Sequence, residues 1–133
     1  MVRKFNFRGL SMEKLRSMTL DEFSGLLTSR GRRALKHGNK RYRKLLESVK
    51  VAKKAAADGA GKVIKTHIRD AVILPDWVGM KFGVHNGKEF KVIDITPEKI
   101  GRRLGEYSHT TGPVRHGGAG VGATRGSKFI PLK

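Results

Sequence analysis

The chain has 133 residues, with 29 Lys or Arg against 11 Asp or Glu, and its formal net charge is +18. A chain of this length forms one domain with a modest core, and so strong a positive charge opposes compaction unless a polyanion neutralises it, which favours a nucleic-acid-binding protein. No apolar run approaches the about 20 residues that span a bilayer, the N-terminus lacks the apolar core of a secretory signal, and cysteine is absent, so we expect a cytoplasmic protein with no membrane partner and no disulfide.

Two short helices are predicted to follow an irregular basic segment at residues 1–10. They begin at Ser11 and Thr19. Thr19 and Glu22 form the pattern of a capping box, in which the hydroxyl and the carboxylate satisfy the first free amides of the helix. Apolar residues recur at helical spacing over residues 20–27. We expect this face to pack on neighbouring elements of the same chain rather than on a partner.

A run of like charges occupies residues 28–44, which contain eight cations and no acid. A solvated helix face usually mixes signs, because opposite charges four residues apart attract each other. Eight positive charges repel one another, and phosphate groups relieve that repulsion, so we favour nucleic-acid contact over a merely solvated face. The predicted contact residues are Arg30, Arg32, Arg33, Lys36, Lys40, Arg41, Arg43 and Lys44.

The longest predicted helix covers residues 39–57, with Asn39 as its N-cap. Its apolar stripe consists of Tyr42, Leu45, Leu46, Val49 and Ala56, and residues 58–61 end it as a linker. Up to Thr66 the chain carries 18 basic and 5 acidic residues, against 11 and 6 in the remainder. The positive charge is therefore concentrated in the N-terminal half.

A small packed core is predicted over residues 67–107. The apolar run Ala71–Leu74, stopped by Pro75, has the pattern of a buried strand, although a short buried helix gives the same pattern. Residues 75–79 then suit one tight helical turn. Its Trp77 is expected to pack in the core or against a partner rather than to stack on a base, because the aromatic residues do not follow the surface-strand pattern of an RNA-recognition sheet.

A hairpin is predicted around Asn86-Gly87, a strong turn signal. A three-residue loop of His85, Asn86 and Gly87 places Phe82 opposite Phe90 and makes one face apolar. We therefore predict that register, since the buried face sets the pairing.

A helix is predicted to begin at Thr96, with Pro97 at its first position, and to end at Gly105. Ile100 and Leu104 share its apolar face. The predicted fold class is therefore α+β: a three-stranded sheet with a packed helix at residues 62–107, a basic helical extension at residues 1–61, and a disordered, basic, Gly-rich tail at residues 108–133.

The tail has six glycines, two prolines and no acid. Such a strand can thread between phosphate backbones, because glycine permits close approach. Residues 129–132 form a terminal apolar patch, either a solvent-exposed remnant or an anchor. The cationic and histidine residues expected to contact nucleic acid here are His109, Arg115, His116, Arg125, Lys128 and Lys133.

Catalytic and cofactor signatures are not recognisable. The five histidines lack paired ligand spacing, and the glycines at 118–122 have no strand before them or helix after them. The carboxylates are too few for a two-metal nuclease. We therefore predict a protein that is not an enzyme and that binds no metal or cofactor.

The order Asn86-Gly87-Lys88, Ile95, Ile100-Gly101 and Leu104 to Tyr107 resembles the signature of the S-nineteen family of small-subunit ribosomal proteins, called S-fifteen in eukaryotes. The N-terminal LSMEKLRSMTLDEF and the final Phe129 to Lys133 resemble the archaeal and eukaryotic branch, although residues 115–120 are richer in glycine than the eukaryotic pattern. The resemblance covers nearly the whole chain.

The resemblance implies a structural component of the small-subunit head that binds the 3′ domain of small-subunit rRNA. It also implies a neighbour of the S-thirteen family, a nearby bridge to the large subunit, and a C-terminal tail that reaches towards the decoding site and tRNA. Carried over by position, Lys65, His67 and Arg69 fall where the family has rRNA-facing polar residues. By the same resemblance, RNA contacts are also expected at the hairpin tip (Asn86, Gly87 and Lys88), on the signature helix (Arg102 and Arg103) and at the head of the tail (Arg115 and His116).

Two other classes of protein share some of these features. A nucleoid DNA-binding protein would carry the same charge but would usually dimerise, and no self-complementary helix is evident. A basic RNA-processing enzyme would need a catalytic constellation, which we do not find. A ribosomal rRNA-binding protein is therefore the predicted function, with the nucleoid protein as the alternative.

Overall fold

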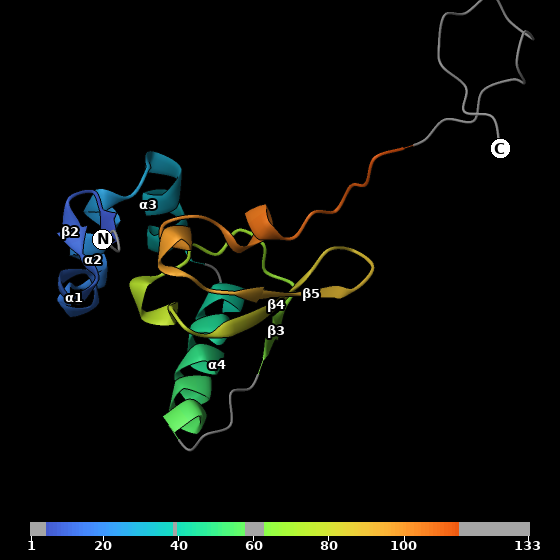
Figure 1. Ribbon diagram of the computed structural model, residues 1–133, viewed down its shortest axis with the longest axis horizontal. Helices are drawn as coiled ribbons and strands as arrows, with labels where there is room; N and C mark the ends of the chain where they lie inside the picture. Colours follow the sequence, from blue (N-terminus) through green and yellow to red (C-terminus); the bar gives the residue numbers. More distant parts are fainter. Residues whose placement is uncertain (1–4, 39, 58–62, 115–133) are drawn as a thin grey trace, which may run out of the picture.

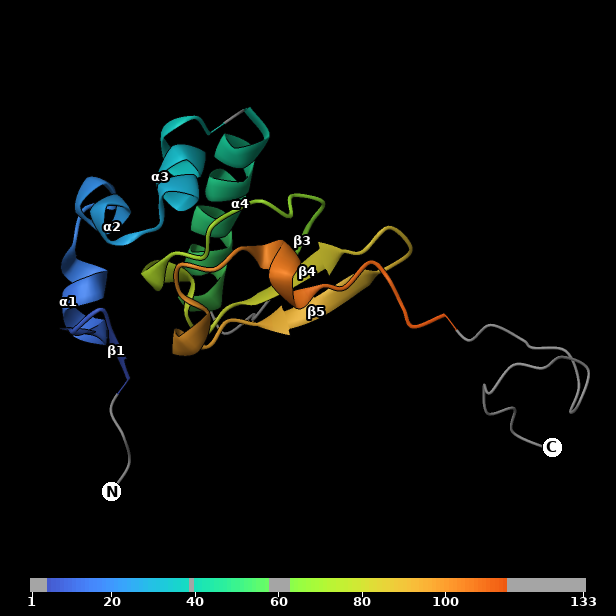
Figure 2. The same ribbon diagram turned by 90° about the horizontal axis from the view of Figure 1, so that it is seen from above.

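The computed structural model describes residues 5–38, 40–57 and 63–114. Within these residues, four α-helices and a three-stranded sheet make up an α+β fold, which is the predicted fold class. The N-terminal helices gather at one end of the molecule, and the hairpin of the sheet points away from them at the other end (Figures 1 and 2). The last described residues leave the fold at the hairpin end.

The N-terminal segment is more regular than its composition suggests. Strands β1 (Asn6–Phe7) and β2 (Leu10–Ser11) pair in an antiparallel hairpin. Its turn places Arg8 at φ 49° and Gly9 at φ 81°, where glycine is unstrained. The expectation of an irregular segment is therefore wrong for the described part of residues 1–10.

Helices α1 (Met12–Ser17) and α2 (Leu20–Leu26) begin as predicted, after Ser11 and Thr19. The capping box of α2 is present: the Thr19 hydroxyl accepts from the Glu22 amide at 3.4 Å, and the Glu22 carboxylate accepts from the Thr19 amide at 3.0 Å. The predicted apolar face packs within this chain at Phe23 and Leu27, which are buried in the core, whereas Leu20 is 57% exposed.

Helix α3 (Ser29–Lys36) leads into the long helix α4 (Lys40–Ala57). The predicted stripe of α4 is confirmed at Tyr42, Leu45 and Val49, which are buried in the same core as the sheet, and at the half-buried Leu46. The predicted N-cap Asn39 and the Ala56 side chain lie outside the described residues.

The sheet has the order β3-β4-β5. Strand β3 (Ile64–Thr66) runs parallel to β4 (Lys81–His85), which pairs in an antiparallel manner with β5 (Phe90–Asp94). The number of strands agrees with the prediction, but its first strand does not, because Ile64–Thr66 takes the place given to Ala71–Leu74. Every residue of Ala71–Leu74 is nevertheless buried, as predicted.

The predicted buried strand and the predicted core helix turn out to pair with each other. The Ile73 amide donates to the Arg102 carbonyl at 2.8 Å, the Gly101 amide to the Ile73 carbonyl at 3.0 Å, and the Leu104 amide to the Ala71 carbonyl at 3.0 Å. Residues 100–104 therefore cannot form the predicted helix, because backbone amides and carbonyls that the helix would need are already paired with residues 71–74.

Short 3₁₀ turns replace that helix. They are η2 (Pro97–Lys99) and η3 (Leu104–Tyr107), separated by Gly101 at φ 77°, which a helix cannot accommodate. The tight turn predicted at residues 75–79 is confirmed as η1 (Pro75–Trp77). Trp77 is buried there and stacks on Phe82 with ring centroids 5.0 Å apart.

The hairpin loop has four residues, Asn86–Glu89, so the predicted three-residue loop is wrong. The Asn86 side-chain oxygen accepts from the amides of Lys88 and Glu89 at 2.9 and 2.8 Å and closes the loop. Phe82 consequently pairs with Ile93 rather than with Phe90. The buried face set the register, as expected, but the β5 residue on that face is Ile93 rather than Phe90. Phe90 and Val92 lie on the opposite, outer face of the sheet.

Candidate nucleic-acid interface

The predicted cluster of cations lies on α3 and on the first turns of α4. We call it the basic cluster: Arg30, Arg32, Arg33, Lys36, Lys40, Arg41, Arg43 and Lys44, all of which are exposed. Helix α3 lies close to the C-terminal end of α2 at the buried Gly31. A side chain there would be crowded, because a Cβ at Gly31 would lie 3.3 Å from Leu27 Cβ. The packed face of α3 thus fixes the backbone from which the arginines project.

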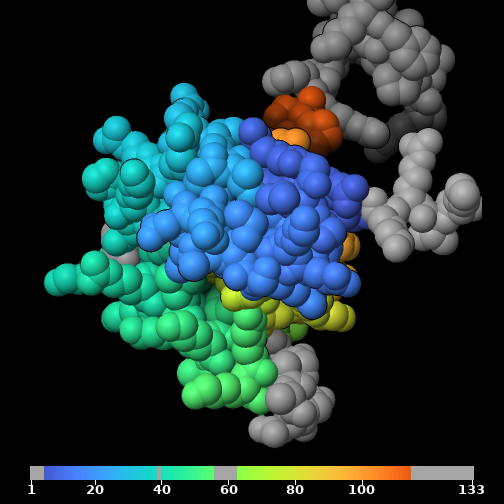
Figure 3. Space-filling model, turned by 90° about the vertical axis from the view of Figure 1, so that its left-hand side faces the viewer, coloured from blue at the N-terminus to red at the C-terminus, as the bar shows by residue number. Residues whose placement is uncertain are grey.

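Helix α3 carries a shallow depression of about 530 Å³. Its lining residues are Ser29, Arg30, Arg32, Arg33, Lys36 and His37, and none of these six is acidic. The side chains of α3 and of the start of α4 project from this part of the molecule in Figure 3, where they are coloured cyan to teal. This surface suits an anionic ligand with repeated charges.

The start of α4 adds further repulsion between like charges to that of α3. Lys40, Arg41, Arg43 and Lys44 fall within its first five residues, and its first turn has no acid. The N-terminus of a helix carries a partial positive charge of its own, so cations are unfavourable there. A phosphate backbone laid along this surface would relieve both repulsions at once.

The two arginines expected on the core helix lie instead in the segment between η2 and η3. Arg103 is half-buried, and its guanidinium is 3.5 Å from the Arg30 carbonyl, so it joins the core to α3. Arg102 is exposed and forms an ion pair with Glu106 at 3.7 Å. The fold thus brings Arg103 beside the basic cluster, whereas Arg102 has an acid as its neighbour.

The remaining described candidates lie around β3 and the hairpin. Lys65, His67, Lys88 and His109 are exposed, and Asn86 is half-buried with its oxygen engaged in the loop. The predicted tail residues Arg115, His116, Arg125, Lys128 and Lys133 lie outside the described residues.

Arg69 has a clear role inside the fold. Its guanidinium donates to the carbonyls of His85 at 2.7 Å, Gly105 at 3.0 Å and Ser108. It therefore ties the end of β4 to η3. Its assignment to RNA binding stays a prediction, and any variant of Arg69 will also change the fold.

Sequence reasoning missed the outer face of the sheet, where His85, Phe90 and Val92 lie beside Lys65 and His67. The signal was the alternation of β5, which puts Phe90 and Val92 opposite the buried Ile93 once the loop has four residues.

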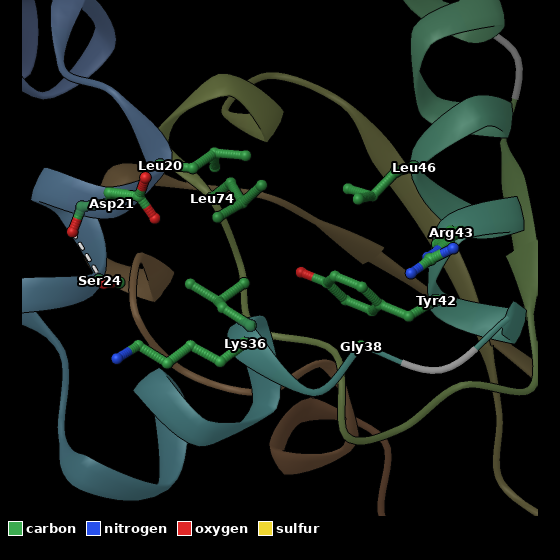
Figure 4. Close-up of a pocket in the computed structure, with 10 residues that line it drawn as sticks. Leu20, Asp21, Ser24, Lys36, Gly38, Tyr42, Arg43, Leu46 and Leu74 are labelled. Atoms are coloured by element: carbon green, nitrogen blue, oxygen red, sulfur yellow. Dashed lines mark hydrogen bonds between the residues drawn. The ribbon is translucent and has the colours of Figure 1, made fainter.

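A separate apolar cavity of about 280 Å³ lies between α2, α3 and α4. Leu20 of α2, Leu74 before η1, and Tyr42 and Leu46 of α4 line it, with Lys36 of α3 among the polar residues around it (Figure 4). Burial raises the pKa of Tyr42 to about 12, and the negative charge of Asp70 adds to this. The cavity thus combines leucine side chains and a phenol that stays neutral with the charged Asp21, Lys36 and Arg43.

Within residues 5–38, 40–57 and 63–114, no three His, Asp or Glu side chains gather in a way that could hold a metal ion. The helices in this part of the chain are all too short or too polar to cross a membrane.

Comparison with known proteins matches residues 33–116 to the ribosomal protein S19 family. A similar protein is the small ribosomal subunit protein uS19 of Methanocella arvoryzae, 44% identical over 132 residues, which cover 98% of this chain and 88% of the relative. The small ribosomal subunit protein uS19 of Methanococcus maripaludis is also 44% identical over 132 residues, covering 98% of this chain and 82% of the relative. The resemblance noted in the sequence is therefore confirmed, and the chain belongs to the ribosomal protein S19 family.

Proposed function

We propose that this protein is a structural, non-enzymatic constituent of the small ribosomal subunit that binds small-subunit rRNA through the basic cluster. Membership of the ribosomal protein S19 family supports the ribosomal role. The observation that carries the binding surface is the placement of eight exposed cations on α3 and the start of α4. We further propose that the rRNA partner is the 3′ head domain and that the protein works in the cytoplasm.

The fold supports binding through the shape and phosphates of the RNA. The basic cluster projects from two consecutive helices and offers charge over a broad surface rather than a single pocket. Arg and Lys on such a surface contact mainly phosphate oxygens, which position a protein without reading sequence. A folded rRNA domain supplies the arrangement of phosphates that such a surface can distinguish from a uniform duplex.

We also propose the neighbours that the family resemblance implies. These are a protein of the S-thirteen family, a bridge to the large subunit, and tRNA reached by residues 108–133. The described part of the tail leaves the molecule at the hairpin end, remote from α1 and α2, which is compatible with a separate contact (Figures 1 and 2).

The test measures the affinity of the full chain for a 3′-domain rRNA transcript across a salt series. Each phosphate contact contributes about 0.7 to 0.9 to the slope of log affinity against log salt. The triple variant R32E/R33E/R41E should lower that slope by about 2 to 3 and weaken binding at every salt concentration.

A matched control reverses three exposed cations away from the basic cluster, K14E/K50E/K54E, and so changes the net charge equally. The proposal predicts a smaller loss for the control. Equal losses from the two variants would show that only total charge matters, and the basic cluster would not be the binding surface.

A further inference from the structure

The outer face of the sheet carries a cluster of rings beside a lysine, which we call the outer-face cluster: Lys65, His67, His85 and Phe90. The ring centroids of His67 and His85 are 4.5 Å apart. Phe90 meets both edge-on, at 5.1 Å from His67 and 4.8 Å from His85. The Lys65 ammonium lies 5.6 Å from the centroid of the Phe90 ring.

Strand pairing explains why these side chains meet. Lys65 is the partner of Gly83 across the parallel pair, and His85 is the partner of Phe90 across the antiparallel pair. Gly83 leaves room between the outer strands, because a Cβ there would lie 3.3 Å from the Lys65 side chain. The rings therefore gather on the face opposite the core.

The outer face is open to solvent. Val92, on the same face as Phe90, is 56% exposed, and Lys65 and His67 are exposed as well. Phe90 and His85 are half-buried and support His67 from beside it. The outer face therefore offers a ligand a histidine ring, the edge of Phe90 and an aliphatic side chain.

The histidine ring at the end of β4 is held in place by the hairpin loop. The Gly87 amide donates to His85 Nδ1 at 3.0 Å, so the neutral ring carries its proton on Nε2. The outer-face cluster thus combines ring planes, a nitrogen donor and a cation. These are the groups that stack on a nucleobase, bond to its edge and neutralise its phosphate.

We propose that the outer-face cluster holds an unpaired base of small-subunit rRNA, with the base stacked on His67 and Lys65 placed against a neighbouring phosphate. The inference rests on the proposed rRNA binding and gives it a second mode of contact. Charge complementarity favours RNA as the occupant, because Lys65 belongs to the cluster and the exposed Lys88 lies in the adjoining hairpin loop. The β5 acid on this face, Asp94, is paired with Lys81 at 3.8 Å. A base in a duplex cannot reach the rings, so the ligand is single-stranded.

Substitutions at His67 separate stacking from charge. His67 is exposed and follows the last residue of β3, so its replacement should leave the fold intact. H67Y keeps an aromatic ring, H67K places a cation there without a ring, and H67A removes the ring and adds no charge. V51A, which trims an exposed valine on α4, is the control for loss of apolar surface elsewhere.

The experiment measures fluorescence anisotropy of the full-length variants with labelled 12-nucleotide oligouridine and with a 12-base-pair RNA duplex. Loss of a base stack should weaken single-strand binding by H67A and H67K about 5-fold or more, with H67Y and V51A close to the parent protein. H67A, H67Y and V51A should bind the duplex as the parent protein does, and H67K, with its added positive charge, should bind it no more weakly. F90L provides a second test, since it keeps apolar volume but removes the ring that supports His67.

Equal single-strand affinities for the parent protein, H67A and F90L would overturn the inference, as would rescue of binding by H67K. The open face would then belong to a protein neighbour or to the hairpin alone. Such a result leaves the proposed function standing if R32E/R33E/R41E still binds the rRNA transcript more weakly than the parent protein. Failure of that triple variant to weaken transcript binding counts against the proposed function and not against the stack.

Discussion

Replacing Arg69 with Met should destabilise the protein by about 3 kcal/mol. The guanidinium donates to the carbonyls of His85, Gly105 and Ser108 from a half-buried position. Methionine fills a similar volume but donates no hydrogen bond, so three carbonyls each lose one hydrogen bond, although the Gly105 carbonyl keeps the one from the Ser108 amide at 3.4 Å. At a net contribution of about 1 kcal/mol for each bond, the three together account for that loss.

The environment of Arg69 leaves little room for compensation. The Gly105 amide donates to the Arg69 carbonyl at 2.8 Å, and a Cβ at Gly105 would lie 2.9 Å from Arg69 Cβ. The two backbones are thus already as close as packing permits, and they cannot close further around a shorter donor. Lysine should also fail to rescue the variant fully, because a single ammonium cannot match the planar fork of a guanidinium.

Urea denaturation followed by the fluorescence of Trp77 gives the measurement, since this buried residue is the single tryptophan of the chain. A loss of 3 kcal/mol corresponds to a fall of about 10 °C in Tm for a domain of this size. The control is R102M, which removes an exposed arginine and one exposed ion pair and should change the unfolding free energy by less than about 0.5 kcal/mol. If R69M matched R102M, the guanidinium would not hold β4 to η3.

Three further predictions concern the backbone, the caps and the tyrosines. G101A should cost about 1 to 3 kcal/mol of unfolding free energy in urea, because Gly101 lies at φ 77° and a Cβ there would approach the Phe7 ring to 3.0 Å, whereas G112A, where a Cβ meets nothing within 4 Å, should cost little. T19A should destabilise by about 1 kcal/mol through loss of the α2 cap, and T28A, at an N-cap without a side-chain bond, should cost less in the same assay; equal effects would mean that the hydroxyl bond contributes nothing. Ultraviolet titration should show Tyr42 ionising at about 12 and Tyr107 above 10, with burial as the main cause for both. Because the pKa values of both tyrosines are higher in the folded state than in the unfolded state, their contribution to the unfolding free energy is complete below pH 10 and is lost as pH rises towards 12. A Tyr42 hydroxyl that titrated at 10 would contradict its burial.

The N-terminal helices could be predicted because their signals are local. Thr19 and Glu22 lie three residues apart and report on the same helix end, and the stripe of α4 repeats over one helix. Such patterns do not depend on which distant segment they meet. The charge of residues 28–44 is equally local, so the basic cluster was predictable as a surface.

The core between residues 71 and 104 could not be predicted in the same way. Ile100 and Leu104 have helical spacing, but the hydrogen bonds of Ile73 with Gly101 and Arg102 join segments almost 30 residues apart. The hairpin failed for a related reason: Phe90 and Ile93 are both apolar, and only the four-residue loop closed by Asn86 decides which of them is buried. The outer-face cluster depends on that register, so the grouping of Lys65 and His67 with His85 and Phe90 could not be predicted, although Lys65 and His67 were themselves predicted contacts.

The central claim is that the protein recognises the 3′ head domain of small-subunit rRNA and does not bind all polyanions alike. The most direct measurement compares the affinity of the purified chain for the 3′-domain transcript and for duplex DNA of equal length as salt rises. The account predicts a preference for the transcript that persists at high salt and falls when residues 108–133 are removed. Equal affinities that vanish together with rising salt would contradict it and would leave the nucleoid-type DNA-binding protein as the better description.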